Sequence, residues 1–334
     1  MLANTFQILR CIPLVNEGMN GMVKGFLFNE FDTYSLNFPF LQTLSQWVTD
    51  LVSLADFDLP GRFDGYGLDT VAYGNVLVNA FSPIVTAAAV LGPTMGVAYG
   101  LHLLTGFGFL KSVGGFCFTS LVANYPLRYL MESVLDLFIS ALNMPLVIFP
   151  RRNMASLADA HFVLAVVCSV LILAVVVGLV IYLCRRKQPD KIHGGLTQLS
   201  DGLLPKMRTV IVFVIWFFGF RLAVAAIVAL SAVASKLLCM GLMVSAALVS
   251  LTVNVTFKFL ESRWQQVVNL IMEALLVVLA VISLVDAEKL MDITDKALVG
   301  TIVTGIVLGT QLLVFLIVGA EMLYNLCVSL TACL

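Results

Sequence analysis

Residues 162–184 read FVLAVVCSVLILAVVVGLVIYLC and are followed at once by Arg185, Arg186 and Lys187. The run carries no charge and is long enough to cross the ~30 Å hydrocarbon core of a bilayer, which takes about 20 apolar residues of helix. It is continuously apolar, whereas the strands of a membrane barrel alternate and have about 10 residues. This stretch therefore predicts a transmembrane helix in an all-α protein.

The whole chain has the composition of a membrane protein. Of its 334 residues, 60% are hydrophobic and 12% are charged, whereas soluble domains are about 25% charged. A globule of this size could not bury so much apolar surface in its own core. The composition excludes a soluble enzyme, a disordered regulator and a disulfide scaffold, and the net charge of -1 gives no basis for binding nucleic acid. The expected partner is the lipid bilayer.

Further apolar runs extend this prediction to a polytopic transmembrane helical bundle over residues 77–334. The segment 1–76 mixes Asn, Asp and Gly with aromatic residues, and we expect it to lie outside the bundle as an extramembrane segment. Within it, the apolar face of Leu44, Trp47 and Leu51 predicts an interfacial helix, or a helix packed against the bundle. Seven spans are predicted, near residues 77–105, 127–149, 162–184, 209–232, 237–257, 267–285 and 298–328.

Basic residues in the loops predict the orientation of the bundle. The loop after the third span contains Lys191 and Arg208 as well as the basic triplet, which places it on the cytoplasmic, matrix or stromal side. Residues 1–76 then lie outside and the C-terminus inside, although Arg151 and Arg152 also fall outside. The chain start lacks the basic region of a cleavable signal peptide. Its first residues are expected either to insert as part of a larger bundle or to continue a longer precursor.

The second span carries three charged residues, Arg128, Glu132 and Asp136, at a spacing of four. A helix places them in one stripe, and each charge costs at least ~2.5 kcal/mol inside a bilayer unless it is paired or reaches water. The stripe must therefore face the bundle or a cavity. It predicts either a path for an ion or substrate, or a structural ion pair between Arg128 and Glu132.

Other spans contain further polar residues. Arg221 is expected to pair with a carboxylate, of which Asp136 and Glu273 are the candidates. The acids outnumber the arginines in the spans, which suits a route for cations or protons if the acids are ionised, and suits buried neutral acids equally well. The remaining intramembrane candidates are Asn269, Gln311 and Glu321.

Glycines at a spacing of four predict close helix packing. Gly92, Gly96 and Gly100 form one such face in the first span, and Gly305 and Gly309 form another in the last. Small residues at this spacing allow two helices to approach closely in a membrane.

Signatures of an enzyme, a metal site or a cofactor are absent from the sequence. The three histidines, His102, His161 and His193, are isolated, and no phosphate-binding loop, dinucleotide fingerprint or nucleophile elbow is present. The glycosylation sequon at Asn254 falls at a membrane edge that is predicted to be inside, and we expect it to be unmodified. The sequence therefore predicts a protein that is not an enzyme and that binds no cofactor or metal.

One resemblance to a known family rests on the order of a set of residues. These are Phe6 to Leu9 with Pro13, the aromatic segment 29–40, Gly67, Asn79, Asn124, Arg128, Glu132, Leu135 to Phe138, Asn143, Gly202, Leu203, Arg208, Arg221, Asn269 and Glu273. In this order the chain resembles the C-terminal membrane region of transient-receptor-potential-like surface proteins of fungi and ciliates. The resemblance implies a plasma or ciliary membrane protein.

The chain departs from that family in two ways. The expected large ectodomain is not found before Met1, so the chain would be either a fragment or a stripped-down relative. The last two spans are joined by only DAEKLMDITDKA, which is short for a pore helix with a selectivity filter. The acids of this loop could attract cations at an outer mouth or simply be solvated. They are Asp286, Glu288, Asp292 and Asp295.

The leading functional prediction is a multi-pass integral membrane protein that anchors or scaffolds a larger membrane-associated assembly, with channel-like ancestry. Its expected partners are other proteins or further copies of the chain. A cation channel or transporter using Glu132, Asp136, Glu273 and Glu321 is the first alternative. An accessory subunit of an energy-converting complex in an organellar inner membrane is the second, and a seven-span receptor is a further candidate.

Overall fold

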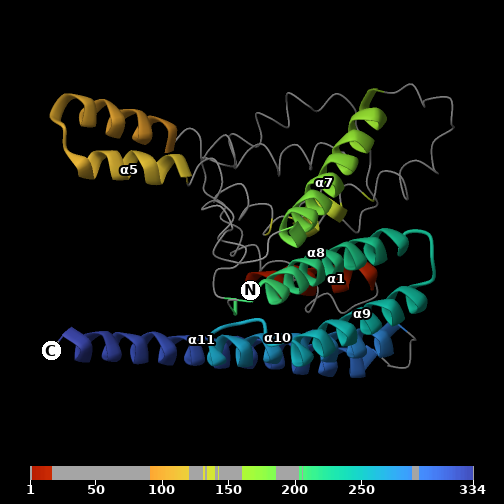
Figure 1. The fold of residues 1–334 in the computed structure, drawn as a ribbon. Coiled ribbons are helices and arrows are strands. Elements are labelled where there is room, and N and C mark those ends of the chain that lie inside the picture. Colours follow the sequence, from red (N-terminus) through yellow and green to blue (C-terminus); the bar gives the residue numbers. More distant parts are fainter. Residues whose placement is uncertain are drawn as a thin grey trace. The chain divides into compact units, whose positions relative to one another are not determined.

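The computed structural model is helical through most of the residues that it describes, which are 2–16, 91–119, 131, 134–139, 142, 160–185, 203–204, 206–287 and 293–333. Within these residues no strand forms, and the β-pairing found there is the isolated bridge between Leu203 and Leu260. The predicted all-α class is confirmed at this level. The helices are α1 (Leu2–Val15), α5 (Gly108–Thr119), α7 (Ala160–Arg185), α8 (Met207–Leu230), α9 (Lys236–Thr256), α10 (Arg263–Ala287) and α11 (Ile293–Cys333) (Figure 1).

Four of these helices, α8 to α11, are long and apolar enough to cross a membrane. They correspond to the last four spans predicted from the sequence, and their boundaries differ from the predicted ones by a few residues. These helices indicate an integral membrane protein. The stretches that meet the requirement are Met207–Leu230, Lys236–Thr256, Arg263–Asp286 and Leu298–Glu321.

The three earlier spans are described less completely. Helix α7 covers the predicted span 162–184, and residues 91–105 of the first span are helical. The second span is described only at residues 131, 134–139 and 142, which are helical. The predicted interfacial helix around Trp47 lies outside the described residues. The number of seven spans therefore stays a prediction.

The chain divides into two compact units, and each is described here by itself. The first unit consists of Met1–Ser35, Gly202–Pro205 and Leu230–Leu334, and the second of Leu36–Asp201 and Lys206–Ala229. The first unit thus contains α1, α9, α10 and α11, whereas α5, α7 and α8 belong to the second.

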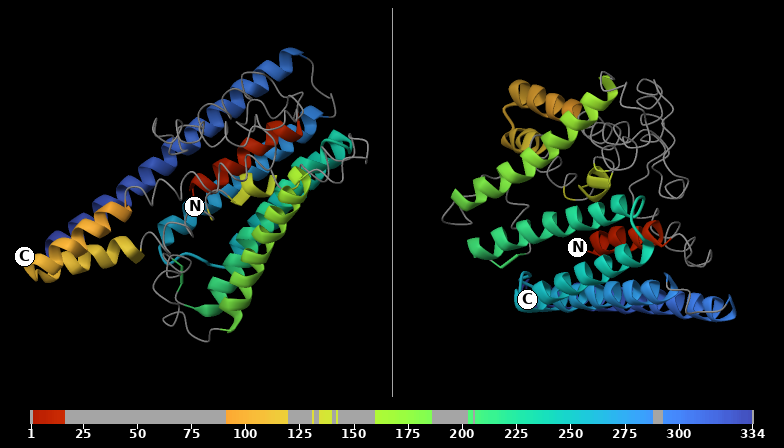
Figure 2. Two further views of the ribbon diagram at one scale, coloured as in Figure 1. Left: turned by 90° about the horizontal axis from the view of Figure 1, so that it is seen from above. Right: turned by 90° about the vertical axis from the view of Figure 1, so that its right-hand side faces the viewer.

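Helix α10 is the centre of the first unit. It packs against α9, α11 and α1, and Figure 2 shows the red α1 beside α10. Although α1 has only 14 residues, its side chains Leu9, Ile12 and Leu14 are fully buried. These buried side chains place α1 in the core of the unit, although its residues fall in the segment that we expected outside the bundle.

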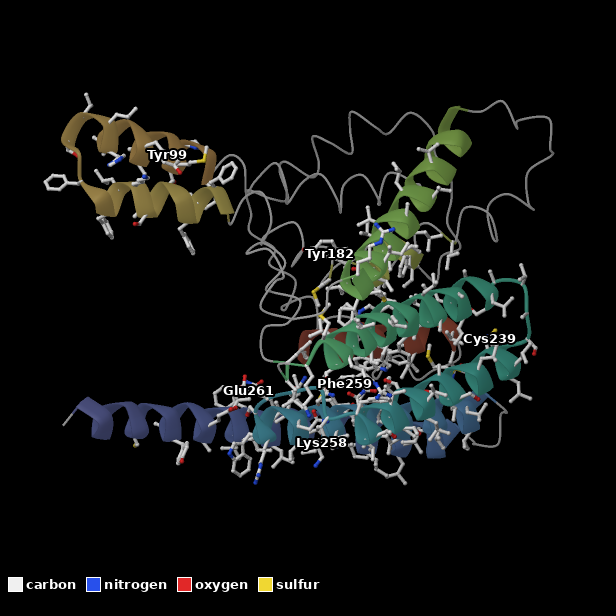
Figure 3. All side chains as sticks on the ribbon, viewed as in Figure 1. Tyr99, Tyr182, Cys239, Lys258, Phe259 and Glu261 are labelled. Carbon is white, nitrogen blue, oxygen red and sulfur yellow. The ribbon has the colours of Figure 1, made fainter. Side chains whose placement is uncertain are left out.

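In the second unit, residues 91–119 form a helix hairpin. A helix over 91–105 ends at Thr105, and α5 begins at Gly108. Tyr99 of the first helix lies against Gly114 of α5, where an added Cβ would come within 2.9 Å of the tyrosine ring (Figure 3). No span was predicted between residues 105 and 127, so the helix α5 is a finding of the structure.

Candidate functional site: the polar seam between α9 and α10

Helix α9 presents one buried stripe toward its neighbours in the first unit. Its members alternate between spacings of three and four, which average 3.5 residues and keep one narrow face of a helix turned to a partner. The three members nearest the N-terminus of α9 are apolar, and the last two are polar. The stripe consists of Met240, Met243, Ala247, Ser250 and Asn254.

Helix α10 carries a matching stripe that runs in the opposite direction. It follows the same alternation of three and four, so the two helices can pack knobs into holes with a shallow crossing angle. Its N-terminal members are polar and therefore lie level with the polar end of α9. The stripe consists of the half-buried Gln266 and the buried Asn269, Glu273, Leu276, Ala280 and Ser283. We call the two facing stripes the polar seam.

Side chains of the seam bind one another across the helix interface. The Ser250 hydroxyl donates to Glu273 Oε2 at 2.7 Å. One turn further along, the Asn269 amide donates to Asn254 Oδ1 at 2.6 Å, and the Asn254 amide donates to the Ser250 carbonyl at 3.0 Å. Each of these four side chains is at least 94% buried, since Asn269 is 6% exposed and the other three are 2% or less. Buried polar groups are costly unless they are hydrogen-bonded, and here they satisfy one another.

Gln266 joins the seam to the connection between the two helices. Its amide donates to the Asn254 carbonyl at 3.1 Å, and its Oε1 accepts from the Leu260 backbone N–H at 3.3 Å. The connection also contains Lys258 and Glu261, whose exposed side chains are labelled in Figure 3 beside the buried Phe259. Charged residues of this kind mark the water-facing end of a helix pair.

Glu321 also lies at this end of the unit. The Ser262 hydroxyl, just before α10, donates to Glu321 Oε1 at 2.6 Å. Ser262 Oγ also accepts from the backbone N–H of Gln265 at 3.4 Å, as an N-cap does. Glu321 is half-buried on α11, which continues beyond it to Cys333. The structure thus places it against the first residues of α10.

At the opposite end of α10, the Asn16 amide donates to the Ser283 carbonyl and to Asp286 Oδ2, both at 3.1 Å. Asn16 follows α1 and is 1% exposed. Between this contact and Glu273, the seam of α10 is filled by the buried apolar residues Leu276 and Ala280. Ten residues of helix separate Glu273 from Ser283, which is about 15 Å. The polar contacts at the two ends of α10 are thus separated by apolar packing.

Arg221 is the buried cation of the second unit. Its guanidinium lies 3.5 Å from the centre of the Phe217 ring, and Nη1 donates to the Phe217 carbonyl at 3.1 Å. The arginine is 1% exposed and sits in an aromatic stretch of α8 that includes Phe213 and Trp216. A cation over an aromatic face is stabilised further when water is excluded. Its predicted pairing with Asp136 or Glu273 stays a prediction.

The structure brings together two of the predicted site residues, Asn269 and Glu273, and adds partners that the sequence analysis missed. Ser250 was not considered, and Asn254 was considered only as a sequon. The sequence did contain a signal for these partners. Ser250 and Asn254 are four residues apart, as are Asn269 and Glu273, and the two pairs lie on opposite sides of a six-residue connection. The Asn254 side chain is fully buried and hydrogen-bonded, so in this fold it is not accessible for glycosylation.

The remaining predicted site residues are placed apart from the seam or not described. Gln311 is half-buried on α11, and Asp136 is half-buried in the helical residues 134–139. Arg128 and Glu132 lie outside the described residues, as do the loop acids Glu288 and Asp292. Among the residues that the structure does describe, no group of three or more His, Cys, Asp or Glu is arranged to hold a metal ion.

Within the described residues, the predicted packing glycines have open space where a side chain would be. A Cβ added at any of them would meet no heavy atom within 4 Å. Their role in close packing between helices therefore stays a prediction. The five positions are Gly92, Gly96, Gly100, Gly305 and Gly309.

No family model, curated protein or solved structure matches this chain. The resemblance to transient-receptor-potential-like proteins therefore stays a prediction. Function has to be inferred from the chain's own residues and contacts.

Proposed function

We propose that the protein is a multi-pass integral membrane protein that anchors or scaffolds a larger membrane-associated assembly. The observation that carries the proposal is the polar seam, in which Ser250 binds Glu273 and Asn254 binds Asn269 across a closed helix pair. Polar residues that serve transport usually face water or a cavity. In the seam they hold two helices together, which is the role expected in a rigid anchor.

Helix α11 supports the same proposal. It has 41 residues and is therefore about 62 Å long, about twice the ~30 Å hydrocarbon core. Only 17% of its candidate span is buried, compared with 50% for α10. Large apolar side chains such as Leu312 and Phe315 are exposed along it. This helix has free surface for lipid and for helices of other proteins.

One pair of glycines on α11 has a spacing that fits contact with another helix. Gly305 and Gly309 are four residues apart and have open space where a side chain would be. Small residues at this spacing let helix backbones approach closely in a membrane. The proposed assembly therefore uses α11 as one of its contact surfaces.

The first experiment is purification of the native protein in mild detergent, followed by mass spectrometry of everything that stays bound. An anchor should retain other proteins in fixed stoichiometry, and replacing both Gly305 and Gly309 with leucine should release them. Gly319→Leu is the matched control, because Gly319 is also open on α11 but outside the spaced pair. Recovery of the chain alone, or with only copies of itself, would contradict the proposal.

The proposal also includes the predicted seven spans, the plasma or ciliary membrane and the ancestry shared with transient-receptor-potential-like proteins. The four candidate spans α8 to α11 support the first of these. Glycosylation-site mapping of the loops tests the number of spans and their orientation. Imaging of the tagged protein distinguishes a surface membrane from an organellar inner membrane, where an accessory subunit of an energy-converting complex would reside.

A cation channel or transporter is the second candidate function. The observation in its favour is Glu273, a carboxyl group that is 2% exposed within a candidate span and bonded to the hydroxyl of Ser250. Ion fluxes in vesicles should fall in Glu273→Gln if this carboxyl carries cations or protons. Glu261→Gln, in the exposed connection, is the control. Equal fluxes in both variants would remove this candidate.

A further inference from the structure

The turn of the hairpin 91–119 is short and tightly bonded. Gly106 has a φ of 71°, in the left-handed region that glycine adopts without strain. Its N–H donates to the His102 carbonyl at 2.7 Å, which closes the preceding helix with a left-handed cap. The N–H of Leu110 donates to the Phe107 carbonyl at 3.1 Å and starts α5. The chain therefore reverses over two residues, Gly106 and Phe107.

Side chains supply the remaining hydrogen bonds of the turn. His102 Nδ1 lies 2.9 Å from the Phe107 carbonyl, and since a carbonyl can only accept, this nitrogen carries the proton. The Phe107 N–H donates to Thr105 Oγ1 at 3.4 Å, and the Thr105 hydroxyl donates to the Leu101 carbonyl at 2.7 Å. The polar groups named here are thus partnered within the turn, although the turn is exposed.

The outside of the same turn is apolar. Leu103 is 84% exposed, Leu104 83%, Phe107 66% and Phe109 76%. No Asp, Glu, Lys or Arg occurs between Asp69 and Lys111. A turn in water normally carries polar residues and leaves its backbone to the solvent. This turn instead exposes large apolar side chains, and it bonds the N–H groups of Gly106 and Phe107 within itself.

We infer that the tip of this hairpin, residues 103–109, lies in the hydrocarbon region of the membrane and contacts lipid acyl chains. Non-helical backbone inside a bilayer needs partners from the protein, because lipid offers none, and the turn provides them for the N–H groups of Gly106 and Phe107 and for the Phe107 carbonyl. A chain that turns back within the hydrocarbon region enters and leaves it on the same side, so this hairpin would replace the first of the seven predicted spans, 77–105.

Tryptophan scanning of the tip tests this inference on the full-length protein in lipid vesicles. Phe107→Trp and, independently, Leu104→Trp add an emission that is measured against the wild-type background of three tryptophans. Lipids brominated in their acyl chains should quench most of the added emission, and aqueous iodide should leave it unchanged. Lys258→Trp, in the exposed connection of α9 and α10, is the control that iodide should quench.

Two results would overturn the inference. Quenching of the tip tryptophans by iodide and not by brominated lipid would place the turn in water. Resistance to both quenchers would show that another protein or another part of this chain covers the tip. Circular dichroism of each variant, with helicity equal to wild type, establishes that the measured chain is folded.

Discussion

In the described part of the chain, the hairpins α9–α10 and 91–119 are held together by different interactions. In α9–α10, polar side chains bond across the helix interface, as Ser250 does to Glu273. In the hairpin 91–119, the polar contacts described above lie in the turn, and the helices approach closely where Tyr99 meets Gly114. Each hairpin reverses an apolar chain, but one is fixed along its length and the other mainly at its tip.

The difference shows two ways in which helices can be held in register within a membrane. In lipid, apolar side chains gain little from burial against one another, so helix association depends on close packing and on hydrogen bonds. The polar seam has a defined register, because its donors and acceptors match at only one alignment. The other hairpin has its register set by a two-residue turn and a missing side chain at Gly114. Four predictions test this contrast.

The largest effect is expected from Glu273→Ala. The change removes the acceptor of the Ser250 hydroxyl and leaves a cavity at a buried position, which should cost about 2–3 kcal/mol in the free energy of unfolding. Unfolding in micelles, followed by circular dichroism, measures it. Glu273→Gln keeps an acceptor oxygen and should stay close to wild type. If both variants are equally unstable, the carboxylate charge matters more than this hydrogen bond.

Opposite effects are expected at two adjacent glycines of α5. An added Cβ at Gly114 would come within 2.9 Å of the Tyr99 ring, whereas at Gly115 the nearest atom is 3.9 Å away. Gly114→Ala should destabilise the protein by about 1–2 kcal/mol through overpacking. Gly115→Ala should stabilise it by up to about 1 kcal/mol, because alanine favours helix.

Thermal unfolding in micelles measures both alanine variants. The smaller side chain of Tyr99→Leu should rescue Gly114→Ala if the ring is the obstacle. Destabilisation of the same size at both glycines would show that the hairpin is not packed in this way.

A smaller effect is expected for the pair Asn254 and Asn269. A double-mutant cycle with alanine isolates their hydrogen bond of 2.6 Å, and the coupling energy should be about 0.6 kcal/mol and at most about 1.7 kcal/mol, the range for such bonds between membrane helices. Denaturation in micelles of the two single variants and the double variant gives the value. A coupling energy of zero would mean that this hydrogen bond only follows from the packing of α9 and α10 and adds nothing to the stability of the helix pair.

The smallest effect is expected at the end of the seam, from Ser262→Ala. It removes the N-cap of α10 and the donor to Glu321, and it should cost about 0.5–1 kcal/mol because the site is partly exposed. Glu321→Gln retains the acceptor and is the matched control. Hydrogen exchange of the first turn of α10 is the most direct measurement. Unchanged exchange in Ser262→Ala would show that neither contact holds this turn.

Much of the fold could be predicted from the sequence, because a helix that crosses lipid satisfies its backbone internally and needs only a long apolar run. The spans that became α8 to α11 were predicted for this reason. Helix α5 could not be found in this way. Its GFLKSVGGFCFT is short, contains Lys111 and three glycines, and glycine is a poor helix former.

The candidate site was predicted only in part. Asn269 and Glu273 stood out because polar residues are rare in a span, but their partners Ser250 and Asn254 did not, since hydroxyl and amide groups at a span end are common. Glu321 also stood out, and the structure bonds it to Ser262, just before α10. The sequence shows that a span contains a polar residue, but it does not show which group that residue binds.

The sequence by itself determined the solvent of this protein and the helical state of its apolar runs, because both follow from transfer of side chains and backbone into lipid, one segment at a time. Only the tertiary structure decided which polar side chains share a hydrogen bond, that α1 packs beside α10, and that the chain turns back at Gly106. Those outcomes depend on the register and rotation of one helix against another, which set distances between residues that are far apart in the chain.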